Sequence, residues 1–186
     1  VAHEQSAAMM ADAYARIGPN IGATMATSGP GATNLITGIC CSWFDSIPVL
    51  HITGQVNTYE QRGAQQGTKN VRQVGFQETD ITSIVSSITK YAVKINDSKN
   101  IPYHFNKAYH LSQKERQGPV LIDIPMDFQR LELDSIKFKP ILNEKEKKID
   151  LFRFNKKITK TINLIKKSKR PVIIVGGGVR LGKCVK

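Results

Sequence analysis

This sequence of 186 residues lacks several features typical of secreted or membrane proteins. Of its three cysteines, Cys40 and Cys41 are adjacent and Cys184 stands alone, so neither a disulfide framework nor a metal-binding spacing is present. No run of about 18 apolar residues occurs, which argues against a membrane-spanning helix. The first residues contain no initiator Met and no signal-peptide pattern. We therefore expect a cytoplasmic fragment that starts inside a folded unit and has no membrane partner.

Acidic residues are scarce in only one part of the chain. The net charge of +12 comes from 27 Lys and Arg against 15 Asp and Glu, but residues 1–130 contain 11 against 10 and residues 131–186 contain 16 against 5. The basic part has neither the interleaved aromatic residues nor a motif of a nucleic-acid reader. A solvated linker and helix face explain it better, so we expect no nucleic-acid partner. A basic α/β nucleotide- or nucleic-acid-binding module is kept as a remote alternative.

Helical and strand patterns alternate along residues 1–130. Apolar spacing predicts helices at 5–17, from Leu35 onward, from Thr79 onward and at 102–117. Short apolar runs predict strands at 21–26, 47–53, 91–95 and 120–125. This alternation predicts an α/β fold in which helices cover both faces of a parallel sheet.

The rest of the chain predicts a boundary and a second unit. Residues 131–148 are charged and contain Pro140, as is typical of an interdomain linker. Within residues 149–186, an apolar stripe on a basic helix precedes an apolar run at 171–175 that ends in three glycines. This order predicts the first helix and a buried first strand of a second, Rossmann-like α/β domain that the chain does not complete.

Two local features are candidates for ligand binding. Glu4 begins the first helix, where the helix dipole favours an ionised carboxylate. The segment 29–34, Gly-Pro-Gly-Ala-Thr-Asn, lets backbone approach a ligand closely at a helix N-terminus, although a tight turn needs glycine even without a ligand. It matches neither a P-loop nor Gly-x-Gly-x-x-Gly. A polar loop of about twenty residues follows the second predicted strand, and loops of that length often cover a site.

Seven segments taken together resemble thiamine-diphosphate-dependent enzymes of the acetohydroxyacid (acetolactate) synthase group over about residues 1–130. The segments are residues 3–4, 11–16, 27–34, 45–49, 53–56, 76–78 and 118–125, and residues 171–178 resemble the opening of the family's central domain. The resemblance implies a thiamine-diphosphate-binding fold: an N-terminally truncated pyrimidine domain at 1–130 and the incomplete start of the central domain at 149–186.

The resemblance also implies roles for individual residues. Glu4 matches the glutamate that hydrogen-bonds a pyrimidine nitrogen of the cofactor and promotes its imino tautomer. Gln77 matches a polar side chain near the reacting centre, Phe76 a pocket position, and Lys90 a basic position near the substrate entrance. The other implied cofactor contacts are Pro30, Gly31, Asn34, Gly54 and Gln55.

The family's cofactors and partners are implied in the same way. They are thiamine diphosphate, Mg²⁺ held by a domain absent here, pyruvate with a second keto acid or aldehyde, a homodimer or homotetramer with the active site at the subunit interface, and a regulatory subunit. FAD is a further candidate, with contacts expected at Gly176, Gly177, Gly178 and Arg180. No metal ligand is expected in this chain.

Two departures from the family pattern limit what the resemblance implies. The loop 57–75 is longer and more polar than in biosynthetic acetolactate synthases, and Met126 stands where many of them have lysine. A related decarboxylase or carboligase with other substrates, for example in surface-polysaccharide synthesis, is therefore the alternative enzyme.

Overall fold

The computed structural model describes residues 1–132, 150–182 and 184. They belong to two units, Val1–Ile141 and Leu142–Lys186, each of which is considered by itself. The predicted linker at 131–148 lies outside the described residues except for its first two positions. Within the described ranges, no helix is both long enough and apolar enough to cross a membrane.

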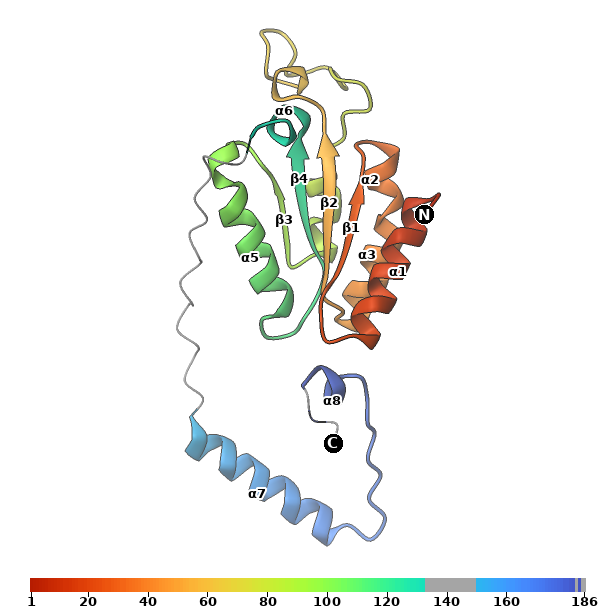
Figure 1. Ribbon diagram of the computed structural model, residues 1–186. Coiled ribbons are helices and arrows are strands. Elements are labelled where there is room, and N and C mark those ends of the chain that lie inside the picture. The colour runs from red at the N-terminus through yellow and green to blue at the C-terminus, as the bar shows by residue number, and fades with distance from the viewer. Residues whose placement is uncertain (133–149, 183, 185–186) are drawn as a thin grey trace. The chain divides into compact units, whose positions relative to one another are not determined.

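The first unit is built on a four-stranded parallel sheet (Figure 1). Its strands are β1 (Gly22–Ala26), β2 (Val49–Gln55), β3 (Tyr91–Lys94) and β4 (Val120–Pro125), in the spatial order β1-β2-β4-β3. Every position of β4 is buried, as expected for a central strand covered on both faces. Because the strands are parallel, their carboxyl ends lie at the same edge of the sheet.

Helices cover both faces of this sheet, which confirms the predicted fold. On one face, α5 (Ile101–Gln113) packs its buried Ala108 against Ile122 and neighbouring apolar residues of β2 and β4. On the other face lie α1 (Glu4–Ile17), α3 (Ile36–Asp45) and α4 (Ile81–Val85), which bury Ala8, Ile39 and Val85 with Leu121. Burying these apolar side chains contributes about 25 cal/mol for each Å² removed from water.

Close packing of α1 against α3 depends on small residues. A Cβ atom added to Gly38 would lie 2.3 Å from the Cβ of Ala8, so only glycine permits this approach. At its start, α1 is capped by His3, whose Nδ1 accepts a hydrogen bond of 3.1 Å from the backbone N–H of Gln5. The helix ends at Gly18, as predicted.

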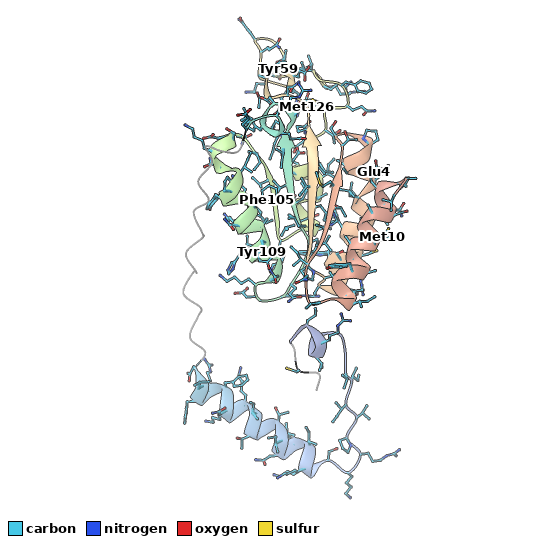
Figure 2. The ribbon with its side chains drawn as sticks, in the orientation of Figure 1. Glu4, Met10, Tyr59, Phe105, Tyr109 and Met126 are labelled. Atoms are coloured by element: carbon cyan, nitrogen blue, oxygen red, sulfur yellow. The ribbon has the colours of Figure 1, made fainter. Side chains whose placement is uncertain are left out.

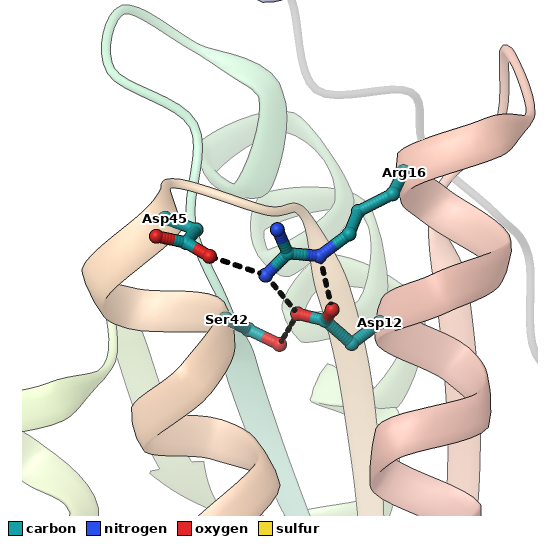
Figure 3. Close-up of polar contacts among 4 residues, drawn as sticks. All are labelled: Asp12, Arg16, Ser42 and Asp45. Atoms are coloured by element: carbon teal, nitrogen blue, oxygen red, sulfur yellow. Dashed lines mark hydrogen bonds and ion pairs between the residues drawn. The ribbon is translucent and has the colours of Figure 1, made fainter. Parts of the chain in front are cut away.

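A polar cluster also joins these two helices (Figure 3). The guanidinium of Arg16 donates to the carboxylate of Asp12 on the same helix and to Asp45 at 2.7 Å. The hydroxyl of Ser42 donates to Asp12 at 2.7 Å. Asp12 is buried, and its oxygens are satisfied by these two donors. The cluster therefore fixes α1 against α3 in one register.

Three details of the first unit differ from the prediction. The helix predicted from Leu35 is preceded by a short helix, α2 (Pro30–Asn34), and a short helix after β4, α6 (Met126–Gln129), was not predicted. The helix predicted to reach residue 117 ends at Gln113. Two aromatic residues of α5, both labelled in Figure 2, have different surroundings: Phe105 packs against the apolar core, whereas Tyr109 is 54% exposed.

Short 3₁₀ helices complete the first unit: η1 (Thr58–Glu60), η2 (Ser86–Ile88) and η3 (Ser98–Asn100). Otherwise the connection from β2 to α4 is irregular, as the polar sequence predicts.

The second unit contains α7 (Leu151–Lys167) and the short α8 (Gly178–Leu181). The predicted helix is confirmed, with Asp150 as its N-cap: the carboxylate accepts from the backbone N–H of Arg153 at 3.1 Å. The predicted buried strand at 171–175 is wrong, because this segment forms no strand and Ile174 is 92% exposed. A strand needs the hydrogen bonds of a neighbouring strand, and the described residues place none beside it.

Candidate functional site

The residues expected to contact thiamine diphosphate gather at the carboxyl edge of the sheet. The chain leaves β1 at Ala26, turns at Gly29 and enters α2, whose first turn faces the start of α1. Glu4 is the first residue of α1, and Asn34 is the last residue of α2. Two residues separated by thirty positions in the sequence are therefore brought together.

Glu4 is held by a direct contact with Asn34. The side-chain amide of Asn34 donates a hydrogen bond of 3.1 Å to Oε2 of Glu4. This bond is the largest cause of a lowered pKa of the Glu4 carboxyl, and a backbone hydrogen bond of Glu4 and the charge of His3 act in the same direction. Partial burial opposes them with a smaller effect. The carboxylate is consequently ionised near neutral pH and held in one orientation.

The glycine turn fits closely around this carboxylate. A Cβ atom at Gly31 would lie 2.7 Å from the methyl group of Thr27 and 3.3 Å from Oε1 of Glu4. Glycine is therefore needed here for space. Pro30 is exposed beside it and fixes the first turn of α2, where its missing N–H costs no hydrogen bond.

The end of the long loop packs against the same turn. Gly29 has φ +59°, and a Cβ atom there would lie 2.6 Å from the Cβ of Gln77. Gln77 also has a positive φ, 59°, which is uncommon for a residue with a side chain and marks a constrained backbone. The structure thus brings Gln77 to the turn that holds Glu4. Phe76 precedes it and is 82% exposed.

Gln55 acts as a structural link at the end of β2. Its amide donates to the backbone oxygen of Thr79 at 2.8 Å and to the carboxylate of Asp123 at 2.9 Å, which uses both N–H groups. Its oxygen accepts from the backbone N–H of Val56. A Cβ atom added to the neighbouring Gly54 would lie 3.4 Å from Nε2 of Gln129, which is an ordinary contact distance. The role of Gln55 and Gly54 as cofactor contacts stays a prediction.

The structure does not bring every expected residue to this edge. Lys90 precedes β3, at the opposite, amino-terminal edge of the sheet, where its Nζ donates to the backbone oxygen of Lys114. Burial lowers the pKa of Lys90. Glycines 176–178 and Arg180 belong to the second unit, where no described atom lies within 4 Å of a Cβ added to any of the three glycines.

Met126, the position at which the resemblance implies lysine in many family members, directly follows β4 (Figure 2). The guanidinium of Arg130 contacts its sulfur at 3.1 Å, so a cation still lies beside this position.

Sequence reasoning missed two carboxylates at this edge. Asp127 accepts hydrogen bonds from the backbone N–H of Thr58 at 3.1 Å and its hydroxyl at 2.6 Å, which anchors the start of the long loop. Asp123 is buried, and burial raises the pKa of its carboxyl despite hydrogen bonds from Thr53 and Gln55. A charged residue in the apolar run 120–125 was the available signal. Across the described ranges, no group of three His, Cys, Asp or Glu side chains could hold a metal ion.

The fold and this edge define a class of enzyme domain. Residues 1–84 match the family described as thiamine pyrophosphate enzyme, N-terminal TPP binding domain. The first unit therefore belongs to the thiamine pyrophosphate enzyme family, as its pyrimidine-binding domain.

Individual relatives are more specific. The chain is 41% identical over 186 residues to a probable acetolactate synthase large subunit of Methanococcus aeolicus, covering 96% of this chain and 28% of that protein. It is 38% identical over 195 residues to the acetolactate synthase large subunit of Cyanidium caldarium, covering 98% and 30%. The corresponding protein of Lactococcus lactis is 38% identical over 182 residues, covering 95% and 29%. The chain thus spans less than a third of the length of these relatives.

One group at this edge has the chemistry to bind a thiamine pyrimidine ring. Glu4 supplies an ionised, oriented carboxylate, which can accept a hydrogen bond from a ring N–H. Gly31 and Gly29 serve the packing around this carboxylate, because Cβ atoms there would collide with Thr27 and Gln77.

Proposed function

We propose that this chain is part of the catalytic subunit of a thiamine-diphosphate-dependent enzyme resembling acetolactate synthase. The enzyme would decarboxylate a 2-keto acid, pyruvate, and join the remaining two-carbon unit to a second keto acid or aldehyde. The observation that carries this proposal is the Asn34–Glu4 hydrogen bond of 3.1 Å beside the glycine turn. The similarity to acetolactate synthase large subunits supports the choice of reaction.

Each residue of the site has a separate task. Glu4 would bind a pyrimidine nitrogen and hold a proton at its carboxylate oxygen, while Asn34 keeps that oxygen in place. Pro30 and Gly31 would line the ring, and Gln77 would reach toward the substrate from the loop that packs on Gly29. When bound, thiamine diphosphate supplies the carbon nucleophile and the electron sink that decarboxylation of a 2-keto acid requires.

The remaining components belong to the proposal as well. Mg²⁺ would be held with the cofactor diphosphate by residues outside this chain, and two copies of the enzyme would build each active site between them in a homodimer or homotetramer. A regulatory subunit is a further proposed partner, because relatives carry the name large subunit. The proposed location is cytoplasmic. A carboligase or decarboxylase with another acceptor is the alternative, supported by the long polar loop 57–75.

Substitution of Glu4 tests the proposal in the full-length protein that carries this sequence. Glu4→Gln keeps the side-chain shape but removes the basic oxygen, so the rate of pyruvate consumption with thiamine diphosphate and Mg²⁺ should fall by about a hundredfold or more. Glu132→Gln is the matched control, because Glu132 is exposed and distant in sequence from the site. Circular dichroism checks the fold. Activity of Glu4→Gln within a few fold of wild type contradicts the role of Glu4.

A product assay separates the two enzyme readings. Pyruvate alone, pyruvate with 2-ketobutyrate and pyruvate with an aldehyde are supplied in turn, and the carbon–carbon coupling products are identified. Formation of acetolactate supports the first reading, and coupling only to an aldehyde supports the second.

FAD binding by the second unit, at Gly176, Gly177, Gly178 and Arg180, is tested by the visible spectrum of the full-length protein after desalting. Absence of near-stoichiometric flavin removes FAD from the proposal.

A further inference from the structure

A polar cavity of about 260 Å³ lies between the long loop and the sheet. Its charged lining consists of Arg62, Arg72, Glu78, Asp80 and Lys94. Lys94 ends β3, so the cavity opens at the carboxyl edge of the sheet. Ligands of open α/β sheets bind at this edge, in crevices outside the strand ends.

Both acidic residues of the lining are engaged by their own neighbours. Glu78 accepts hydrogen bonds from the backbone N–H groups of Arg62 at 2.7 Å and Val74 at 2.9 Å, one on each carboxylate oxygen. Asp80 caps α4: it accepts from the backbone N–H of Ser83 at 3.1 Å and from two hydroxyl groups. These bonds hold the two carboxylates in the framework of the loop and the helix.

The two arginine side chains are not engaged in this way. Among residues 1–132, 150–182 and 184, the ion pairs are those of Arg16 with Asp12 and Asp45, and no side-chain hydrogen bond of Arg62 or Arg72 is present. The third cation, Lys94, donates to Oε1 of Gln61 at 2.8 Å. Two guanidinium groups therefore line the cavity with their donors available.

The size and chemistry of the cavity fit a small oxyanion. A guanidinium presents a planar fork of N–H donors that matches the two oxygens of a carboxylate or phosphate. The volume of about 260 Å³ lies just below the range of about 300–1,000 Å³ for pockets that hold drug-sized ligands. The cavity is therefore suited to a compact anionic group.

We propose that Arg62 and Arg72 form a binding site for a small molecule bearing a carboxylate or phosphate group. The site is separate from the Glu4–Asn34 pair. Of the expected cofactor contacts, Gln55 alone lines the cavity, and its amide is already bonded to Thr79 and Asp123. The proposal therefore does not depend on the proposed enzyme activity.

Chemical protection tests this site residue by residue in the full-length protein, without thiamine diphosphate and Mg²⁺. Phenylglyoxal modifies accessible guanidinium groups, and peptide mass spectrometry gives the rate at each arginine. Millimolar inorganic phosphate or malonate, compared with chloride at equal ionic strength, should slow modification at Arg62 and Arg72. The rate at Arg153, which is exposed on α7, should not change and serves as the internal control.

Calorimetric titration with the same anions supplies the second measurement. The double variant Arg62→Gln/Arg72→Gln should weaken binding by about tenfold or more, because it removes charge-assisted hydrogen bonds. Lys69→Gln, on the same loop but outside the cavity lining, should bind like wild type. Protection by phosphate alone or by malonate alone identifies the group that is bound. Absence of protection by either anion, equal protection at Arg153, or an equal loss in Lys69→Gln overturns the proposal.

Discussion

Thr24 and His51 are register partners in β1 and β2, and their side chains share a hydrogen bond of 2.8 Å between Oγ1 and Nδ1. Both side chains are buried, and Nε2 of His51 has no hydrogen-bond partner within the described part of the chain. Burial lowers the pKa of His51 to about 3, from an ordinary value of 6.5, although Asp12 opposes the shift. The folded protein therefore keeps this imidazole neutral.

This histidine predicts acid sensitivity of the fold. Between pH 6.5 and about 3, the unfolded chain binds a proton at His51 that the folded protein excludes. The contribution to stability is complete above pH 6.5 and is lost as the pH falls below it, by about 1.4 kcal/mol per pH unit. Urea unfolding at several pH values measures this slope.

The double variant Thr24→Val/His51→Val isolates the effect, because it removes the titrating group together with its hydroxyl partner. Its stability should depend on pH less steeply, by about one proton. Equal slopes in the double variant and the wild type contradict the assignment to His51.

Removal of the Asn34 amide should change the acidity of Glu4. The hydrogen bond from Asn34 is the largest cause of the lowered pKa of Glu4, so Asn34→Ala should raise that pKa toward its ordinary value of 4.5. The acid limb of the pH–rate profile of the full-length enzyme should then move to higher pH. Asn20→Ala, at an exposed position before β1, should leave the profile in place. A profile that Asn34→Ala does not move would separate Asn34 from the control of Glu4.

Gly29 and Gly63 form a matched pair for testing the contact with Gln77. Both have positive φ, +59° and +84°, so alanine is strained at either position, by about 1–3 kcal/mol. At Gly29 the new Cβ would also meet Gln77 at 2.6 Å, whereas at Gly63 nothing lies within 4 Å. Gly29→Ala should therefore lower the free energy of unfolding by about 1–3 kcal/mol more than Gly63→Ala does. Equal losses in denaturant unfolding would mean that Gln77 moves away without cost.

The residues of the cluster around Asp12 should contribute unequally to the free energy of unfolding. Arg16→Met leaves the buried Asp12 carboxylate with Ser42 as its remaining partner, so the free energy of unfolding should fall by about 1–3 kcal/mol. Asp45→Asn removes only the negative charge of a side chain that is 57% exposed and should cost at most about 1 kcal/mol. Urea unfolding measures both variants. A larger loss of free energy of unfolding for Asp45→Asn than for Arg16→Met would contradict the prediction.

Burial patterns explain which elements could be predicted from the sequence. The run 120–125 is apolar at nearly every position because β4 is covered on both faces, and α1 shows small residues at helical spacing because α3 approaches it closely. The short helices α2 and α6 have too few residues for a periodic signal. The apolar run 171–175 has the composition of a strand, but composition cannot supply a neighbouring strand.

The part of the candidate site around Glu4 was predictable from the resemblance rather than from local sequence patterns, because its residues are far apart in the chain. The resemblance associates Glu4 with the turn that contains Gly31 and Asn34. In the structure Asn34 is hydrogen-bonded to Glu4 and Gln77 packs on Gly29, while the roles of these residues stay predictions. Lys90 lies at the other edge, because a residue just before a parallel strand is a full strand length from a residue just after one. The free guanidinium groups of Arg62 and Arg72 depend on which backbone groups Glu78 binds, and sequence patterns do not reveal that choice.

The two hydrogen bonds of Glu78 allow part of the long loop to vary in length without moving the rest. Its carboxylate ties Arg62 to Val74, so residues 63–73 leave and return at one fixed point. The entropic cost of closing such a loop increases only slowly with the number of residues added to it. Phe76 and Gln77 come after Val74 in the chain, so they would keep their positions whatever the length of the segment between Arg62 and Val74. Members of the family can therefore differ in this segment without rebuilding the turn at Gly29, and new specificities can be tried there by insertion or deletion alone.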